Sequence, residues 1–138
     1  MSLIRQGMKR RVFNKPIRVS PKEKRTYNDV VYDSIAEMKR SCVLDMMVAA
    51  ADIQAWFRQV PFQLGPDTVW RADFVVIDLP QHDEDGPIHI HIEDVKQFET
   101  PASRRIKKLW KKYGPYDLHI IGLRSGDIVI RAAVRRKA

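Results

Sequence analysis

The sequence lacks both a pair of cysteines and a long apolar run. Its single cysteine, Cys42, cannot form an internal disulfide bond, which suits a reducing compartment such as the cytoplasm, or the cytoplasm of a host cell. No apolar stretch approaches the roughly 18 residues of a membrane span, so we expect no membrane partner. The opening residues MSLIRQGMKRRVFNK are basic but have no apolar segment behind them, and they predict no secretory signal.

What the chain does contain is typical of one globular domain. Of its 138 residues, 44% are hydrophobic and 30% are charged, an ordinary balance for a protein that buries a core of its own. No internal repeat or biased tract is present, which excludes repeat and low-complexity architectures.

Positive charge is concentrated at the start of the chain. Residues 1–26 contain nine lysines and arginines against one acid, Glu23, so this segment alone accounts for the net charge of +8. We therefore divide the chain into a basic N-terminal arm, residues 1–26, and a domain, residues 27–138. Basic arms commonly bind nucleic-acid phosphates, and Arg10 and Arg11 are the candidate contacts; the alternative is a solubilising tail that binds nothing specific.

The domain opens with a helix signal. Ser34 followed three residues later by Glu37 has the spacing of a capping box, and the apolar residues behind it recur at helical intervals. This pattern predicts a helix over residues 34–51. The side chains expected on its buried face are Ile35, Met38, Cys42, Met46 and Ala49.

Three strands are predicted after this helix, over residues 57–63, 69–78 and 87–96. In each of them, β-branched and aromatic residues stand between turn signals. The acidic stretch 81–86 has the composition of a solvated hairpin loop joining the second strand to the third.

A second helix is predicted from Thr100–Pro101 to Gly114, because threonine caps helices and proline is tolerated at the first helical position. Its apolar stripe consists of Ile106, Leu109, Trp110 and Tyr113. The cations around that stripe are Arg104, Arg105, Lys107, Lys108, Lys111 and Lys112. Like charges on one short helix repel one another, so a nucleic acid would relieve them, although a solvated basic face is the simpler alternative. Two strands, 116–123 and 127–134, complete the domain.

The stretch from Trp70 to Lys96 carries the most informative chemistry. Side chains on a strand alternate between its faces, so Asp94 and Lys96 point the same way, where a carboxylate and an ammonium can share a metal-bound water. Asp73 stands among large apolar residues, where an unpaired carboxylate is costly to bury. Such a set of residues suits cleavage of a phosphodiester bond.

Each of these residues also has a structural interpretation. Glu37 could simply complete the helix cap, and Asp94 with Lys96 could form a plain ion pair. Glu93, beside Asp94 but of opposite strand parity, is the alternative for the acid of the motif. We choose Asp94, because the acid–x–lysine spacing selects it.

The order helix, three strands, helix, strand, with these acids on it, resembles the core of the PD-(D/E)XK nuclease superfamily. The resemblance covers about residues 27–123 and is nearest to small phage-encoded members, including the endonuclease I-type Holliday-junction resolvases. The segments that carry it are Tyr32-Asp33-Ser34-Ile35-Ala36-Glu37, Arg58-Gln59-Val60-Pro61-Phe62, Trp70-Arg71-Ala72-Asp73-Phe74 and His91-Ile92-Glu93-Asp94-Val95-Lys96. The chain departs from the family at Ala72, where proline is usual, and at Asp94, where many relatives have glutamate.

The resemblance implies an α/β, restriction-endonuclease-like fold, an αβββαβ core whose mixed central sheet is flanked by helices. The implied ligands of Mg²⁺ or Mn²⁺ are Asp73, Asp94, the main-chain carbonyl of Val95 and, for a second ion, Glu37. Lys96 would orient the attacking water or lower its pKa. Arg58 and Gln59 would touch the scissile phosphate or support Glu37, the alternative being ordinary strand surface.

The function that follows is metal-dependent hydrolysis of DNA, by an endonuclease that selects branched structures in phage or mobile-element DNA processing. The small size and basic arm, with no added sequence-reading module, argue against a site-specific restriction enzyme. Symmetric cutting of a junction would require two active sites, which a homodimer supplies. The alternatives are a catalytically silent nucleic-acid-binding module, and an exonuclease or nicking nuclease acting on linear or single-stranded DNA.

Overall fold

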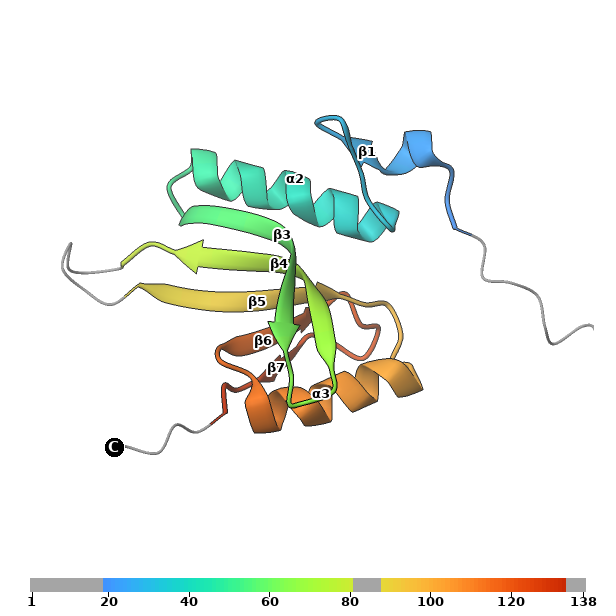
Figure 1. The fold of residues 1–138 in the computed structure, drawn as a ribbon. Coiled ribbons are helices and arrows are strands. Elements are labelled where there is room, and N and C mark those ends of the chain that lie inside the picture. Colours follow the sequence, from blue (N-terminus) through green and yellow to red (C-terminus); the bar gives the residue numbers. More distant parts are fainter. Residues whose placement is uncertain (1–18, 81–87, 134–138) are drawn as a thin grey trace, which may run out of the picture.

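The computed structural model describes residues 19–80 and 88–133 (Figure 1). Its elements, in chain order, are the 3-10 turn η2 (Lys22–Arg25), β1 (Thr26–Tyr27), β2 (Val30–Val31), α2 (Ile35–Ala49), β3 (Ile53–Gln63), β4 (Val69–Asp78), β5 (His89–Val95), α3 (Pro101–Tyr113), β6 (Asp117–Ile121) and β7 (Ile128–Ile130). The predicted acidic loop at 81–86 and the contacts of Arg10 and Arg11 lie outside the described residues.

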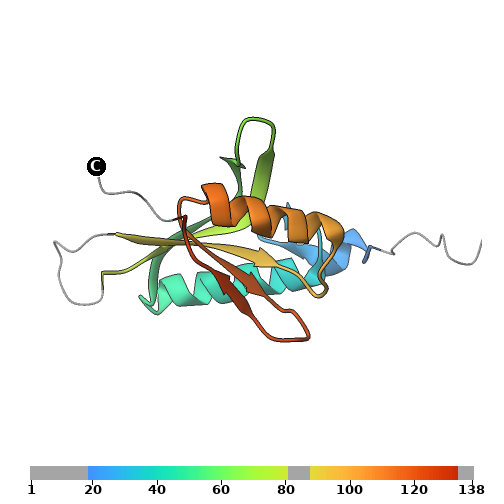
Figure 2. The same ribbon diagram turned by 90° about the horizontal axis from the view of Figure 1, so that it is seen from below.

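A five-stranded sheet in the order β3-β4-β5-β6-β7 forms the centre of the fold. Its strands pair antiparallel except for β5 and β6, which run parallel and are connected through α3. Helix α2 lies on one face of the sheet and α3 on the other (Figures 1 and 2). The predicted α/β class, with a mixed sheet flanked by helices, is therefore confirmed.

Most predicted elements are present, with adjusted ends. Strand β4 has the predicted bounds, whereas β3 begins at Ile53, four residues earlier than expected. The predicted strands 116–123 and 127–134 shorten to Asp117–Ile121 and Ile128–Ile130. In the part of the chain that the structure describes, no helix is both long enough and apolar enough to cross a membrane.

The buried face of α2 differs from the predicted one. The helix buries Glu37, Ser41 and Leu44, while Met46 is 63% exposed and Ala49 is exposed as well. Polar groups can occupy this face because they have partners; the Ser41 hydroxyl, for example, donates a hydrogen bond of 2.6 Å to the carbonyl of Met38. Of the other predicted positions, Ile35, Met38 and Cys42 are half-buried, and Met38 packs against the core. The predicted stripe is therefore wrong at Met46 and Ala49, in the second half of the helix.

Helix α3 follows the sequence signals closely. Thr100 caps it in a full capping box with Ser103, and Gly114 ends it. Trp110 is fully buried and meets Phe62 and Trp70 edge-on at ring-centroid distances of 5.3 and 5.6 Å. A Cβ atom at Gly114 would come within 2.5 Å of the Trp110 ring, so only glycine allows the chain to leave the helix against this indole.

The hairpin of β3 and β4 bends in its middle, so that its outer half turns toward α3 (Figure 1). Arg58 pairs with Phe74 and Val60 with Ala72, which leaves Gln59 and Asp73 opposite each other at the bend. Gln59 has a φ of +54°, a left-handed conformation that is uncommon for a residue other than glycine. This strained position sets Asp73 at the turning point of β4.

The end of the predicted basic arm packs against the domain. Residues 22–25 form the turn η2, and the Arg25 guanidinium donates hydrogen bonds to the carbonyls of Ser20 and Tyr32 at 2.9 and 2.6 Å. Whether residues 1–18 behave as an arm lies outside the described part of the chain.

Candidate active site

Three carboxylates from three different elements gather at one end of the sheet. Glu37 comes from the first turn of α2, Asp73 from the bend of β4, and Asp94 from the end of β5. Lys96 is the first residue after β5. Its main-chain N–H donates a 2.9 Å hydrogen bond to the carbonyl of Ile121, which holds it beside the end of β6. The sheet thus brings together residues that are far apart in the sequence.

Hydrogen bonds fix the positions of these side chains. The main-chain N–H of Val95 donates to Asp73 Oδ2 at 2.8 Å, which ties the bend of β4 to the end of β5. Gln59 Nε2 donates to Glu37 Oε1 at 3.3 Å. Lys96 Nζ lies 3.8 Å from Asp94 Oδ2, at the outer limit of an ion pair. Gln59 therefore supports Glu37, which was one of its two predicted roles.

The cluster of Glu37, Asp73 and Asp94 contains more negative charge than the neighbouring Lys96 can compensate. Glu37 is 3% exposed and Asp94 is 6% exposed. Burial and the neighbouring Asp73 and Asp33 charges raise the pKa of Glu37 to about 7. Burial, the Asp73 charge and a hydrogen bond with the Asp73 carboxyl raise the pKa of Asp94 to about 8, against a smaller opposing effect of Lys96. A bound cation would offset this accumulation of acids.

The raised pKa values predict how stability depends on pH. Near pH 6 the folded protein retains protons on Asp94 and Glu37 that the unfolded chain has released, so this part of the free energy of unfolding falls as the pH rises toward about 8. In buffers free of divalent cations, thermal melts between pH 5 and pH 9 should show a falling Tm. Asp94→Asn should flatten this fall.

The exposed Asp67 provides the matched control for that experiment, and Asp67→Asn should leave the pH dependence of Tm unchanged. An equally steep fall in Asp94→Asn and in the wild type would contradict the charge distribution described above.

Glu93, the alternative acid, lies in a different environment. It is 1% exposed and receives two hydrogen bonds of 2.7 Å from the Arg40 guanidinium of α2. The His91 ring bridges Glu93 and Asp78, at 2.9 Å from each. Burial raises the pKa of Glu93, but the hydrogen bonds from His91 and Arg40 outweigh it and hold that pKa below its usual value. Glu93 is thus committed to an ion-pair network, whereas Asp94 contacts Asp73.

The donor set fits a hard divalent cation. Mg²⁺ prefers carboxylate and carbonyl oxygens, and it is commonly held by one or two carboxylates together with waters and substrate phosphates. Asp73 and Asp94 are in direct contact and supply two such carboxylates. Among the described residues, no group of three or more acidic, histidine or cysteine side chains is arranged around one point. The fit is therefore to a two-carboxylate site completed by water and substrate, with Glu37 beside it.

A cleft opens from this cluster toward α3. Its volume is about 340 Å³, and Asp94 and Lys96 share its wall with the first turns of the helix. The other lining residues are Trp70, Thr100, Ala102, Ser103, Arg105, Ile106, Lys107, Leu118 and Ile120. Two of the predicted nucleic-acid contacts, Arg105 and Lys107, thus face the same space as the acid and lysine of the motif.

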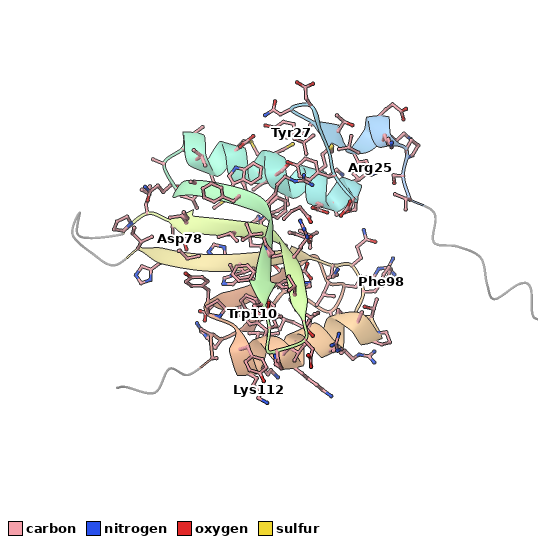
Figure 3. All side chains as sticks on the ribbon, viewed as in Figure 1. Arg25, Tyr27, Asp78, Phe98, Trp110 and Lys112 are labelled. Carbon is pink, nitrogen blue, oxygen red and sulfur yellow. The ribbon has the colours of Figure 1, made fainter. Side chains whose placement is uncertain are left out.

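The remaining predicted contacts are distributed differently. The Arg58 guanidinium stacks on the Tyr32 ring at 4.6 Å, and its Nε is buried without a hydrogen-bond partner. Arg104, Lys108 and Lys111 line a second groove on the other flank of α3, and Lys112 lies at the exposed end of the helix (Figure 3). Five of the six cations of this helix therefore line the cleft, the second groove or, in the case of Lys107, both.

Sequence reasoning missed two features beside the site. Arg40 was not singled out, although its place one helical turn after Glu37 puts both on the same side of α2. Phe98 is 56% exposed on the loop between β5 and α3, at the opposite end of the sheet from Asp78 (Figure 3), and the Arg124 guanidinium lies 5.2 Å from its ring. An aromatic residue two positions after the motif lysine was the available signal.

Comparisons of the chain with protein-family models, with curated proteins and with solved structures found no match. The interpretation of the site therefore rests on its own residues and geometry.

Proposed function

We propose that this protein is a metal-dependent DNA endonuclease of the PD-(D/E)XK superfamily, selective for branched DNA. The observation that carries the proposal is that Asp94 and Lys96 line a cleft together with Arg105 and Lys107 of α3. The carboxylates of Asp73 and Glu37 lie close enough to Asp94 to raise its pKa. Acids and a lysine at the end of a strand are common, but a buried carboxylate that shares a cleft with cationic side chains suits hydrolysis of a nucleic acid.

The fold supports a restriction-endonuclease-like core. A helix precedes an antiparallel unit of β3, β4 and β5, and a second helix connects this unit to the parallel strand β6. Asp73 lies at the bend of β4, and the acid–x–lysine motif, Asp94 to Lys96, lies at the end of β5. This order of elements, with the acids at these positions, supports the proposed core.

The residues of the cluster have separable roles in the proposed reaction. A bound Mg²⁺ or Mn²⁺ supplies Lewis-acid chemistry, polarising a phosphate and lowering the pKa of a water. Asp73, Asp94 and the Val95 carbonyl would hold it, with Glu37 serving a second ion directly or through water. The Lys96 ammonium would orient the attacking water and reduce the repulsion between the carboxylates and a phosphodiester.

The cationic surface of α3 favours an enzyme that selects DNA by its shape and not by its base sequence. Contacts from Arg105 and Lys107 to phosphates would position DNA without reading its bases. Branched DNA of a phage or mobile element presents several backbones at once, which suits cations on both flanks of α3. Symmetric cutting of a four-way junction would require a homodimer with two such sites.

The test is cleavage of end-labelled four-way junction, flap, linear duplex and single-stranded DNA, each with Mg²⁺, with Mn²⁺ and with EDTA. We expect metal-dependent cutting of the junction at a rate at least tenfold above that of the linear duplex. Preferential cutting of linear or single-stranded DNA would retain the nuclease but replace its substrate. Binding without cutting under either metal would instead indicate a catalytically silent binding module.

A further inference from the structure

A second groove, of about 560 Å³, runs along the flank of α3 that faces β7. It is lined by Glu99, Arg104, Lys107, Lys108, Lys111, Ile128, Val129, Ile130 and Arg131. Five of these residues are cations and one is an acid. The apolar part of the lining comes from the edge strand β7, and four of the five cations come from α3.

The spacing of the helix residues explains why one wall is so basic. Arg104, Lys107, Lys108 and Lys111 follow the i, i+3, i+4, i+7 pattern, which places them on one side of a helix. They span about 10 Å along the axis, close to three nucleotide steps of one strand in duplex DNA. A row of cations of this length can contact phosphates of one strand.

Glu99, the one acid in the lining, leaves most of the positive charge of the groove uncompensated. Glu99 lies at one end, where it contacts Lys107 and lies 3.8 Å from Arg104. Arg131 is bound to Asp117 at 3.1 Å. For Lys108 and Lys111, the described part of the chain offers no acidic partner within 4 Å. The two lysines repel each other across one helical turn, and an anion in the groove would relieve that repulsion.

The groove and the catalytic cleft share one lining residue. Lys107 belongs to the lining of both, and Arg104 and Arg105 are neighbours on opposite flanks of the helix. A nucleic acid with its scissile phosphate beside Asp94 and Lys96 would therefore meet the groove as soon as it passed over α3.

We propose that the groove between α3 and β7 binds the phosphate backbone of a second DNA arm while the first arm occupies the catalytic cleft. The proposal rests on the proposed nuclease function and adds to it a binding surface, formed by Lys108, Lys111 and Arg131, that lies outside the catalytic cleft. A linear duplex would fill one surface, whereas a branched molecule would fill both.

The test is the salt dependence of binding to a four-way junction, measured by fluorescence anisotropy in EDTA so that no cleavage occurs. Each lysine–phosphate contact contributes about 0.9 to the slope of log K against log [salt]. Lys111→Gln should reduce the magnitude of the slope by about 0.9, and Lys108→Gln/Lys111→Gln by about 1.8. The double variant should also bind about 60-fold more weakly at 0.1 M salt, the loss that this slope change gives relative to 1 M salt.

Lys39→Gln is the matched control, because it removes the same charge from the exposed side of α2. It should leave the slope unchanged. Equal slopes for the double variant, the control and the wild type would overturn the groove proposal while leaving the nuclease proposal intact. Absence of DNA binding by the wild type would overturn both. Binding with the expected slopes but without cleavage under Mg²⁺ or Mn²⁺ would retain the groove and remove the nuclease.

Discussion

Asp73→Asn and Lys96→Ala should each lower the single-turnover rate of junction cleavage by about a thousandfold or more. Asp73 contacts Asp94 and would be a metal ligand, and an amide in its place would bind Mg²⁺ far more weakly. Removing the Lys96 ammonium would leave the attacking water without its positioning group and the carboxylates without their adjacent positive charge.

Stability measurements would separate loss of chemistry from loss of fold. In Asp73→Asn, the oxygen of the introduced amide can still accept the Val95 N–H bond, and loss of one negative charge relieves Glu37 and Asp94. The Tm of Asp73→Asn without metal should therefore equal or exceed that of the wild type. Asp67→Asn and Lys39→Ala, both exposed changes, should retain full activity. A large drop in Tm with Asp73→Asn would assign this residue a structural role.

Arg40→Ala should lower the free energy of unfolding by about 3 kcal/mol, corresponding to about 10 °C in Tm. The substitution leaves the carboxylate of Glu93, which is 1% exposed, without its bidentate partner. His91 is then the remaining partner of the buried charge. Chemical denaturation at pH 7 would measure the change.

Two further variants make this stability test specific. Lys39→Ala removes a neighbouring cation that is exposed, and it should change the free energy of unfolding by less than about 0.5 kcal/mol. Arg40→Ala/Glu93→Gln should be more stable than Arg40→Ala, because a neutral amide is less costly to bury unpaired than a charge. A loss below about 1 kcal/mol for Arg40→Ala would show that Glu93 does not depend on this partner.

Local signals predicted local structure well. Thr100, Pro101 and Gly114 define both ends of α3, because capping and helix termination depend on residues within one turn. The bounds of β4 followed from its apolar run between turn signals. Asp94 was singled out by its spacing from Lys96, and Asp73 by its apolar surroundings. Glu37 was included because of the family resemblance, since its spacing from Ser34 also fits a helix cap.

Features that depend on distant partners could not be predicted. The buried face of α2 is set partly by Arg40 and Glu93, which are 53 residues apart. Apolar periodicity alone therefore misplaced the end of the stripe, at Met46 and Ala49. The bend at Gln59 requires a left-handed conformation that its residue type does not signal. The α3 cations line two surfaces because β7 lies along one flank of the helix and the end of β5 faces the other. These neighbours are distant in the sequence.

The most direct measurement is single-turnover cleavage of a four-way junction by the wild type and by Asp73→Asn, side by side in Mg²⁺ and in EDTA, with binding followed in parallel. We expect the wild type to cut only with Mg²⁺, and Asp73→Asn to bind the junction at least as tightly without cutting it. Cutting by Asp73→Asn at the wild-type rate, or cutting by either protein in EDTA, would contradict a metal-dependent site built on Asp73 and Asp94.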